Sequence, residues 1–150
     1  MAAKRNALWG WLARTCARAR LRIKSPAMTN SLAIRITAAL GFLAVALGAF
    51  GAHSLKELLA RNGTTAVWEK AVLYHFVHVA VMMLLAFRAP LRRGPWISFL
   101  VGVIIFSGSL YLLAITGLKW LGAITPFGGV SFLVGWAWLL ICIPRENPAN

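Results

Sequence analysis

Four long apolar runs constrain the fold of this chain more than any other feature. They cover about residues 34–52, 68–87, 96–117 and 120–143. A helix of about 20 mainly apolar residues crosses the hydrocarbon core of a bilayer, so each run is long enough to span it. A soluble domain of 150 residues, 60% of them hydrophobic, could not bury so much apolar surface. The sequence therefore predicts an all-α integral membrane protein, a four-helix bundle running up-down-up-down with short loops.

Residues 1–30 form a basic arm, amphipathic or disordered, that stands apart from the transmembrane domain expected over residues 31–150. The arm has no acidic residue, and Arg14, Arg18 and Arg22 recur every four residues, as on one face of a helix. Three interpretations stay open: a helix lying on the membrane surface, a targeting peptide, or a segment that precedes a true start at Met28. The whole chain carries 16 Lys and Arg against three acids. Because these bases lie in the arm and beside the apolar runs, we expect them to bind anionic lipid headgroups and not nucleic acid.

The distribution of basic residues also predicts the orientation of the spans. One side of the membrane receives the arm and these residues: Arg35, Arg88, Arg92, Arg93, Arg145. The other side receives fewer: Lys56, Arg61, Lys70, Lys119. Positive loops stay inside, so we expect both termini in the cytoplasm. If translation starts at Met28, the two sides become nearly equal and the orientation is almost undetermined.

Small residues and tryptophans indicate how the spans pack and where they end. Ala44, Gly48 and Ala52 form an i, i+4, i+8 stripe on the first span, which lets another helix approach closely, in the same chain or in a second copy. Three spans begin with a tryptophan (Trp68, Trp96, Trp120), and Trp138 lies near the far end of the fourth, so we expect aromatic belts at both membrane interfaces.

The second span, Trp68–Phe87, carries the polar residues of greatest interest. His75 and His78 are three residues apart and share one helix face. A histidine inside a membrane span is a candidate functional residue by default. Estimated depths place further polar residues in the same half of the bilayer, so we expect a polar pocket built from these residues: His53, His75, His78, Tyr111, Thr125.

A helix break is expected beside this pocket, in the fourth span. Pro126 frees a carbonyl group, and Gly128 and Gly129 loosen the next turn. Irregular backbone at membrane depth is tolerated where it is buried in protein or lines a wet cavity.

The pocket has a plain interpretation and sharper ones. Polar side chains commonly join transmembrane helices, each bond contributing roughly 1 kcal/mol. Ligation of a metal or haem by His75 and His78 lacks a carboxylate or cysteine to complete the set, so no cofactor or metal is expected. Cys16 and Cys142 have no metal spacing, and no nucleophile motif is present. We therefore expect no catalytic residues.

Four segments resemble a known family. The first is LGAFGAH (47–53), and the second is Trp68 and Ala71 followed by YHxxH (74–78). The third is SGSLYLLAITG (107–117), and the fourth is LGAITPFGG (121–129) followed by Phe132, Gly135 and Trp136. Together, in this order, they resemble domain-of-unknown-function family 423, over roughly residues 32–143. The resemblance implies four spans, a bacterial inner-membrane location and no assigned activity or catalytic residues. The family's usual start resembles MTNSLAIR, so residues 1–27 depart from it.

Two functions remain open from the sequence. The first is a non-enzymatic membrane protein that acts through helix packing, as a homo-oligomer or with a membrane partner. The second is a small transporter, or a protein that handles protons or metal ions, with His53, His75 and His78 in its pocket.

Overall fold

The computed structural model describes residues 30–88 and 90–141. These residues form α2 (Asn30–Ala52), α3 (Lys56–Asn62), α4 (Thr65–Ala86), α5 (Arg93–Gly102), η1 (Val103–Ser107), α6 (Gly108–Thr116), η2 (Lys119–Ala123) and α7 (Thr125–Ile141). Helices α5, η1 and α6 follow one another without interruption, and are called the third helix below. Four segments are long and apolar enough to cross a membrane: Asn30–Ala52, Thr65–Ala86, Arg93–Thr116 and Lys119–Ile141. The predicted all-α, four-span fold is confirmed, while the basic arm and Cys142 lie outside the described residues.

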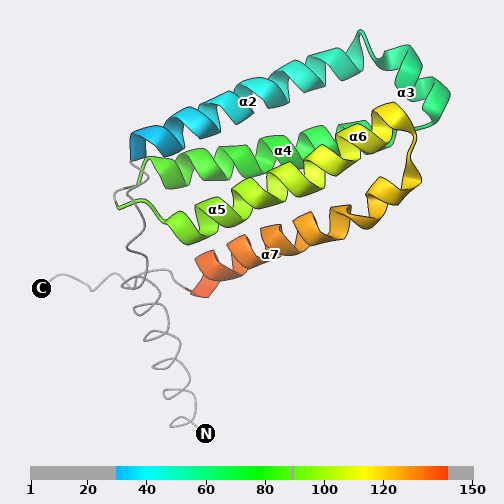
Figure 1. Cartoon of the computed structure of the whole chain (residues 1–150). Coiled ribbons are helices and arrows are strands. Elements are labelled where there is room, and N and C mark those ends of the chain that lie inside the picture. The colour runs from blue at the N-terminus through cyan, green and yellow to red at the C-terminus, as the bar shows by residue number, and fades with distance from the viewer. Residues whose placement is uncertain (1–29, 89, 142–150) are drawn as a thin grey trace, which may run out of the picture.

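The four spans lie side by side in chain order, each antiparallel to the next (Figure 1). The start of α2 and the end of α7 lie at the same end of the bundle, and α3 covers part of the other end (Figure 1). In the most apolar stretch of each span, 39% of the residues of α4 and 44% of the third helix are buried, against 17% in each outer span. The two central helices therefore hold the core, and α2 and α7 turn most of their surface toward lipid.

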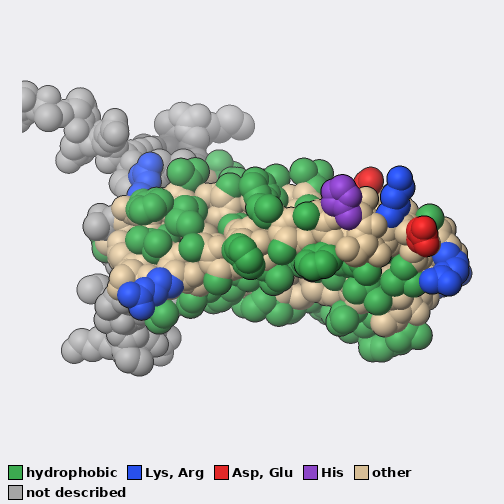
Figure 2. Space-filling model, turned by 90° about the horizontal axis from the view of Figure 1, so that it is seen from above, with side chains coloured by type: hydrophobic (Ala, Val, Ile, Leu, Met, Phe, Trp, Pro, Cys, Tyr) green, Lys and Arg blue, Asp and Glu red, His purple; other side chains and the backbone are tan. Residues whose placement is uncertain are grey.

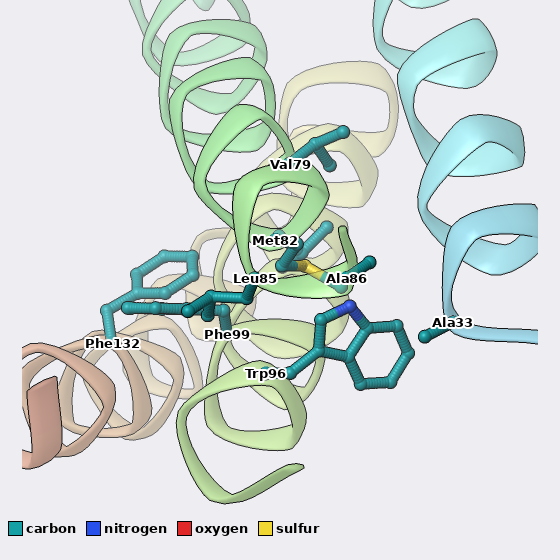
Figure 3. Packing of buried hydrophobic residues seen from close by; sticks show 9 residues of the cluster. Ala33, Val79, Met82, Leu85, Ala86, Trp96, Phe99 and Phe132 are labelled. Carbon is teal, nitrogen blue, oxygen red and sulfur yellow. The ribbon is translucent and has the colours of Figure 1, made fainter. Parts of the chain in front are cut away.

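The buried apolar residues form two clusters separated by a polar layer. The cluster nearer the termini contains Trp96, Phe99 and Met82 (Figure 3), and the other contains Leu59, Trp68, Ala71, Tyr111 and Ala114. His75 and His78 lie along α4 between Ala71 and Val79, and Ser107 lies along the third helix between Val103 and Tyr111. We call these three buried residues, His75, His78 and Ser107, the polar layer.

Two of the tryptophans expected at the membrane interface are buried against α2. Trp68 is 2% exposed, and its Nε1–H donates to the Leu47 carbonyl oxygen at 3.1 Å. Trp96 is fully buried beside Ala33 and Ala86 (Figure 3), and its Nε1–H donates to the Thr37 hydroxyl at 3.1 Å. The two indoles attach the first span to the core near the starts of α4 and α5.

Polar side chains near both ends of the bundle bond the last carbonyl groups of neighbouring helices. Asn62 Nδ2 donates to the carbonyl oxygens of Ala114 and Ile115, and the Thr64 hydroxyl donates to Ala114 O at 2.8 Å. At the opposite end Asn30 Nδ2 donates to Ala86 O. The last carbonyl groups of a helix have no intrahelical partner, so these bonds satisfy groups that lipid could not.

The third helix contains a π-helical turn that the sequence did not indicate. In η1 the Gly108 N–H donates to the Val103 carbonyl oxygen, five residues back. Such a turn inserts one residue into the helix and is frequent at functional sites. It lies in the middle of the span, at the level of the polar layer.

The predicted helix break at Pro126, Gly128 and Gly129 is wrong. Helix α7 runs without interruption from Thr125 to Ile141, and the break falls earlier, at Ile124 between η2 and α7. Pro126 lies in the first turn of α7, where a missing N–H removes no intrahelical bond. A Cβ on Gly128 would lie 2.3 Å from the Phe106 backbone nitrogen, so this glycine allows α7 to approach η1 closely.

The surface has the charge pattern of a membrane-spanning protein. On the face shown in Figure 2, hydrophobic side chains cover the middle and the charged side chains gather at the two ends.

The three residues of the predicted small-residue stripe differ in burial: Ala44 is buried, Gly48 is half-buried and Ala52 is exposed. A Cβ on Gly48 would meet Val72 at an ordinary 3.5 Å, so α4 does not require a glycine there.

Candidate functional site

His78 is held by hydrogen bonds at both ring nitrogens. Its Nδ1 lies 2.7 Å from the Tyr74 carbonyl oxygen, which only accepts, so Nδ1 carries a proton and donates. The Trp136 indole N–H only donates, and it lies 3.3 Å from His78 Nε2. These partners define a neutral imidazole with no free nitrogen, which joins α4 to α7.

The His78 ring is also enclosed by aromatic rings from three helices. It stacks on Phe132 of α7 with the ring centroids 3.6 Å apart, and Phe99 of α5 lies 5.5 Å away. Tyr74 of α4 stacks on Phe106 of η1 at 4.7 Å. These contacts hold the His78 ring in place, as expected for a residue that packs between helices.

His75 has a different environment, with one ring nitrogen bonded and the other without a partner. Its Nδ1 lies 3.3 Å from the Tyr111 hydroxyl of α6, and the residue is 2% exposed. Its Nε2 is buried and has no hydrogen bond. Whichever tautomer is present, one donor or acceptor of this ring is unsatisfied, at a cost of about 1–3 kcal/mol.

Ser107, across from α4 in the π-helical turn, has the second unsatisfied atom. The residue is fully buried, and its Oγ has no partner. The Tyr74–Phe106 ring contact joins the residues directly before His75 and Ser107, so the two unsatisfied atoms lie at a similar depth. No other buried side-chain nitrogen or oxygen lacks a partner in residues 30–88 and 90–141.

The structure does not bring the five predicted pocket residues into one site. His75 and Tyr111 are bonded, but His78 turns toward α7 and is fully bonded there. His53 is exposed at the turn after α2, and its side chain makes no hydrogen bond with another described residue. Thr125 bonds Ser109 at 2.8 Å. Residues of similar depth on different helices need not share a face, and depth alone was the basis of the prediction.

An open apolar groove lies between α2 and α4, in the half of the bundle away from the termini. Its volume is about 390 Å³, and none of the five predicted pocket residues lines it. The lining residues are Gly48, Gly51, Ala52, Leu59, Thr65, Trp68, Glu69, Val72, Leu73 and Phe76.

Metal binding by the histidines gains no support from the geometry. No group of three or more His, Cys, Asp or Glu side chains suited to a metal ion occurs in the described part of the chain. His78, with both nitrogens bonded to protein groups, has no lone pair free for a metal.

The sequence analysis did not predict that Trp136 bonds His78, or that Ser107 lies in the polar layer with an unsatisfied hydroxyl. Trp136 stands four residues after Phe132 on α7, and this i, i+4 aromatic pair on one face was the available signal. Ser107 gave no signal, because nothing in the sequence marks a π-helical turn.

These features define a class of protein: a multi-pass helical membrane protein with a buried polar layer between its central helices. Residues 47–129 match the family model described as protein of unknown function, DUF423. The chain belongs to this family, which confirms the resemblance seen in its motifs.

Named relatives agree with this assignment. The UPF0382 membrane protein YwdK of Bacillus subtilis is 41% identical over 106 residues, covering 66% of this chain and 85% of the relative. The UPF0382 inner membrane protein YgdD of Escherichia coli K12 is 38% identical over 120 residues, covering 76% of this chain and 90% of the relative. No solved structure matches the chain.

Proposed function

We propose that the protein is a non-enzymatic component of the bacterial inner membrane that acts by lateral association, with a second copy or another membrane protein. The observation that carries this proposal is the state of His78, a buried residue of the polar layer. Both of its nitrogens are bonded to protein groups, and its ring is stacked. A side chain held in this way stabilises the bundle and has no free group for chemistry.

The outer helices supply surfaces for association. Phe42 of α2 is 78% exposed and Leu133 of α7 is 68% exposed, on spans that turn most of their surface outward. Large side chains on such spans contact lipid or another protein.

The proposed location and orientation rest on a relative and on charge. The Escherichia coli relative is named an inner membrane protein. The basic arm adds positive charge beside the termini, which favours termini in the cytoplasm, where the arm would meet anionic headgroups.

Cysteine cross-linking in native membranes tests the association. In a background of Cys16→Ser and Cys142→Ser, we expect Phe42→Cys or Leu133→Cys to give one disulfide-linked species of fixed size under mild oxidation. Ala71→Cys, which is buried, is the matched control and should give none. Equal, expression-dependent cross-linking from both outer faces, or none from either, would contradict the proposal.

A second candidate function is favoured by the two unsatisfied atoms. His75 Nε2 and Ser107 Oγ are buried at a similar depth beside a π-helical turn. Such a pair suits a small transporter that passes protons or a small cation through the bundle.

Proteoliposomes containing a pH-sensitive dye test this second function. We expect a proton flux that His75→Phe and Ser107→Ala abolish and that His53→Ala leaves unchanged. Wild-type flux no greater than that of empty vesicles would exclude a proton pathway.

A further inference from the structure

The groove between α2 and α4 has the length of one acyl chain. It extends along α4 from Thr65 to Phe76. At about 1.5 Å per residue this is about 16 Å. Half of the hydrocarbon core of a bilayer is about 15 Å thick. The groove therefore reaches from the membrane interface to near the midplane, within one leaflet.

The walls of the groove are mainly apolar, and the wall formed by α2 is shallow because its residues are small. Gly48 and Ala52 form the α2 side, and Val72, Leu73 and Phe76 form the α4 side. Leu73 and Phe76 are 60% and 51% exposed, so the groove opens laterally toward lipid. Association between helices in lipid depends on packing, and an unfilled groove there is filled by an acyl chain or by a protein side chain.

A carboxylate lines the interfacial half of this groove. Glu69 is exposed on the first turns of α4, and Thr65 lies one turn nearer the interface. No salt bridge to Glu69 occurs within the described residues, and no Lys or Arg lines the groove. An ammonium group placed beside this carboxylate would be attracted, whereas an anionic headgroup would be repelled.

We propose that the groove binds one phospholipid of the leaflet opposite the termini, with an acyl chain along Gly48 and Val72 and an ammonium headgroup, as in phosphatidylethanolamine, at Glu69. The proposal is independent of the proposed function, since it concerns a different face and needs no protein partner. It gives Gly48 a role that packing against α4 does not, since a Cβ there would meet Val72 at an ordinary 3.5 Å.

Native mass spectrometry of the full chain tests the proposal, after extraction from nanodiscs with equal phosphatidylethanolamine and phosphatidylglycerol. We expect one phosphatidylethanolamine retained per chain, at least five-fold over phosphatidylglycerol. Gly48→Leu fills the groove and should reduce retention about ten-fold. Ala38→Leu, at an exposed small residue elsewhere on α2, is the matched control and should not. Glu69→Gln should keep a lipid but lose the headgroup preference.

Three results would overturn the proposal. The first is retention in wild type that follows the bulk lipid ratio, and the second is retention that Gly48→Leu leaves unchanged. The third is a wild-type dimer that Gly48→Leu separates with no change in bound lipid, which would show that a second copy fills the groove. That last result would support the proposed function, so failure of the lipid site and failure of lateral association are distinguishable.

Discussion

At the scale of single residues, Gly128 allows a helix contact that no other residue type permits. A Cβ at this position would lie 2.3 Å from the Phe106 nitrogen, a backbone atom that cannot turn aside. We expect Gly128→Ala to destabilise the bundle by about 1–3 kcal/mol through overpacking. Gly129→Ala is the control, since its Cβ would be 3.8 Å from the nearest atom, Phe106 Cδ2. Unfolding of both variants in mixed micelles measures the difference, and equal stability would contradict the close approach.

The buried hydroxyls of Thr37 and Ser107 should respond in opposite ways to removal. Thr37 accepts from the Trp96 indole N–H and donates to Ala33 O, so Thr37→Val leaves the buried Trp96 N–H without a partner. We expect a loss of about 1–3 kcal/mol in the free energy of unfolding. Ser107 Oγ has no partner, so Ser107→Ala should leave stability unchanged or raise it. Destabilisation by Ser107→Ala of the same size as by Thr37→Val would indicate a bound water or ion at the polar layer.

At the scale of elements, two indole hydrogen bonds join α2 to the central helices in addition to its apolar packing. The Trp68 indole N–H reaches Leu47 O, and Gly51 leaves room for that indole, since a Cβ there would lie 2.1 Å from Trp68 Nε1. We expect Trp68→Phe to speed hydrogen exchange in residues 44–52 by roughly 2–10-fold, the value of one net hydrogen bond. Trp120→Phe removes an exposed indole and should leave exchange in α2 unchanged. Unaltered exchange in both variants would show that α2 is held by apolar packing alone.

The elements also show how far sequence reasoning reaches. The spans were predictable because length and hydropathy fix them, as with Thr65–Ala86. Burial of His75 and His78 followed from the cost of exposing them to lipid. Tyr111, the partner of His75, was among the predicted pocket residues, but Trp136, the partner of His78, was not, because hydropathy does not fix how α7 is rotated about its axis. Glycines raised a false expectation of a break, since a glycine that loosens a helix and one that admits a neighbour look the same in sequence.

At the scale of the whole molecule, orientation in the membrane depends on the arm. In the described part of the chain, each end of the bundle carries a similar set of basic residues, with Arg35 and Arg88 at one end and Lys56 and Arg61 at the other. We expect the full chain with green fluorescent protein at its C-terminus to fluoresce, and the same fusion to alkaline phosphatase to be inactive. A chain starting at Met28 should give mixed orientations. A periplasmic C-terminus in the full chain would contradict the proposed orientation.

A four-span bundle with a buried polar layer requires that α4 turn its histidines into the bundle and its apolar residues toward lipid. The most direct test places a single nitroxide label at successive positions of α4 in bilayers. The accessibility of each label to dissolved oxygen, which concentrates in lipid, shows which face of α4 contacts lipid. We expect minima at His75 and His78, which are 2% and 5% exposed. We expect maxima at Leu73, Phe76 and Leu84, which are 60%, 51% and 69% exposed. A uniform profile, or maxima at the two histidine positions, would contradict this arrangement.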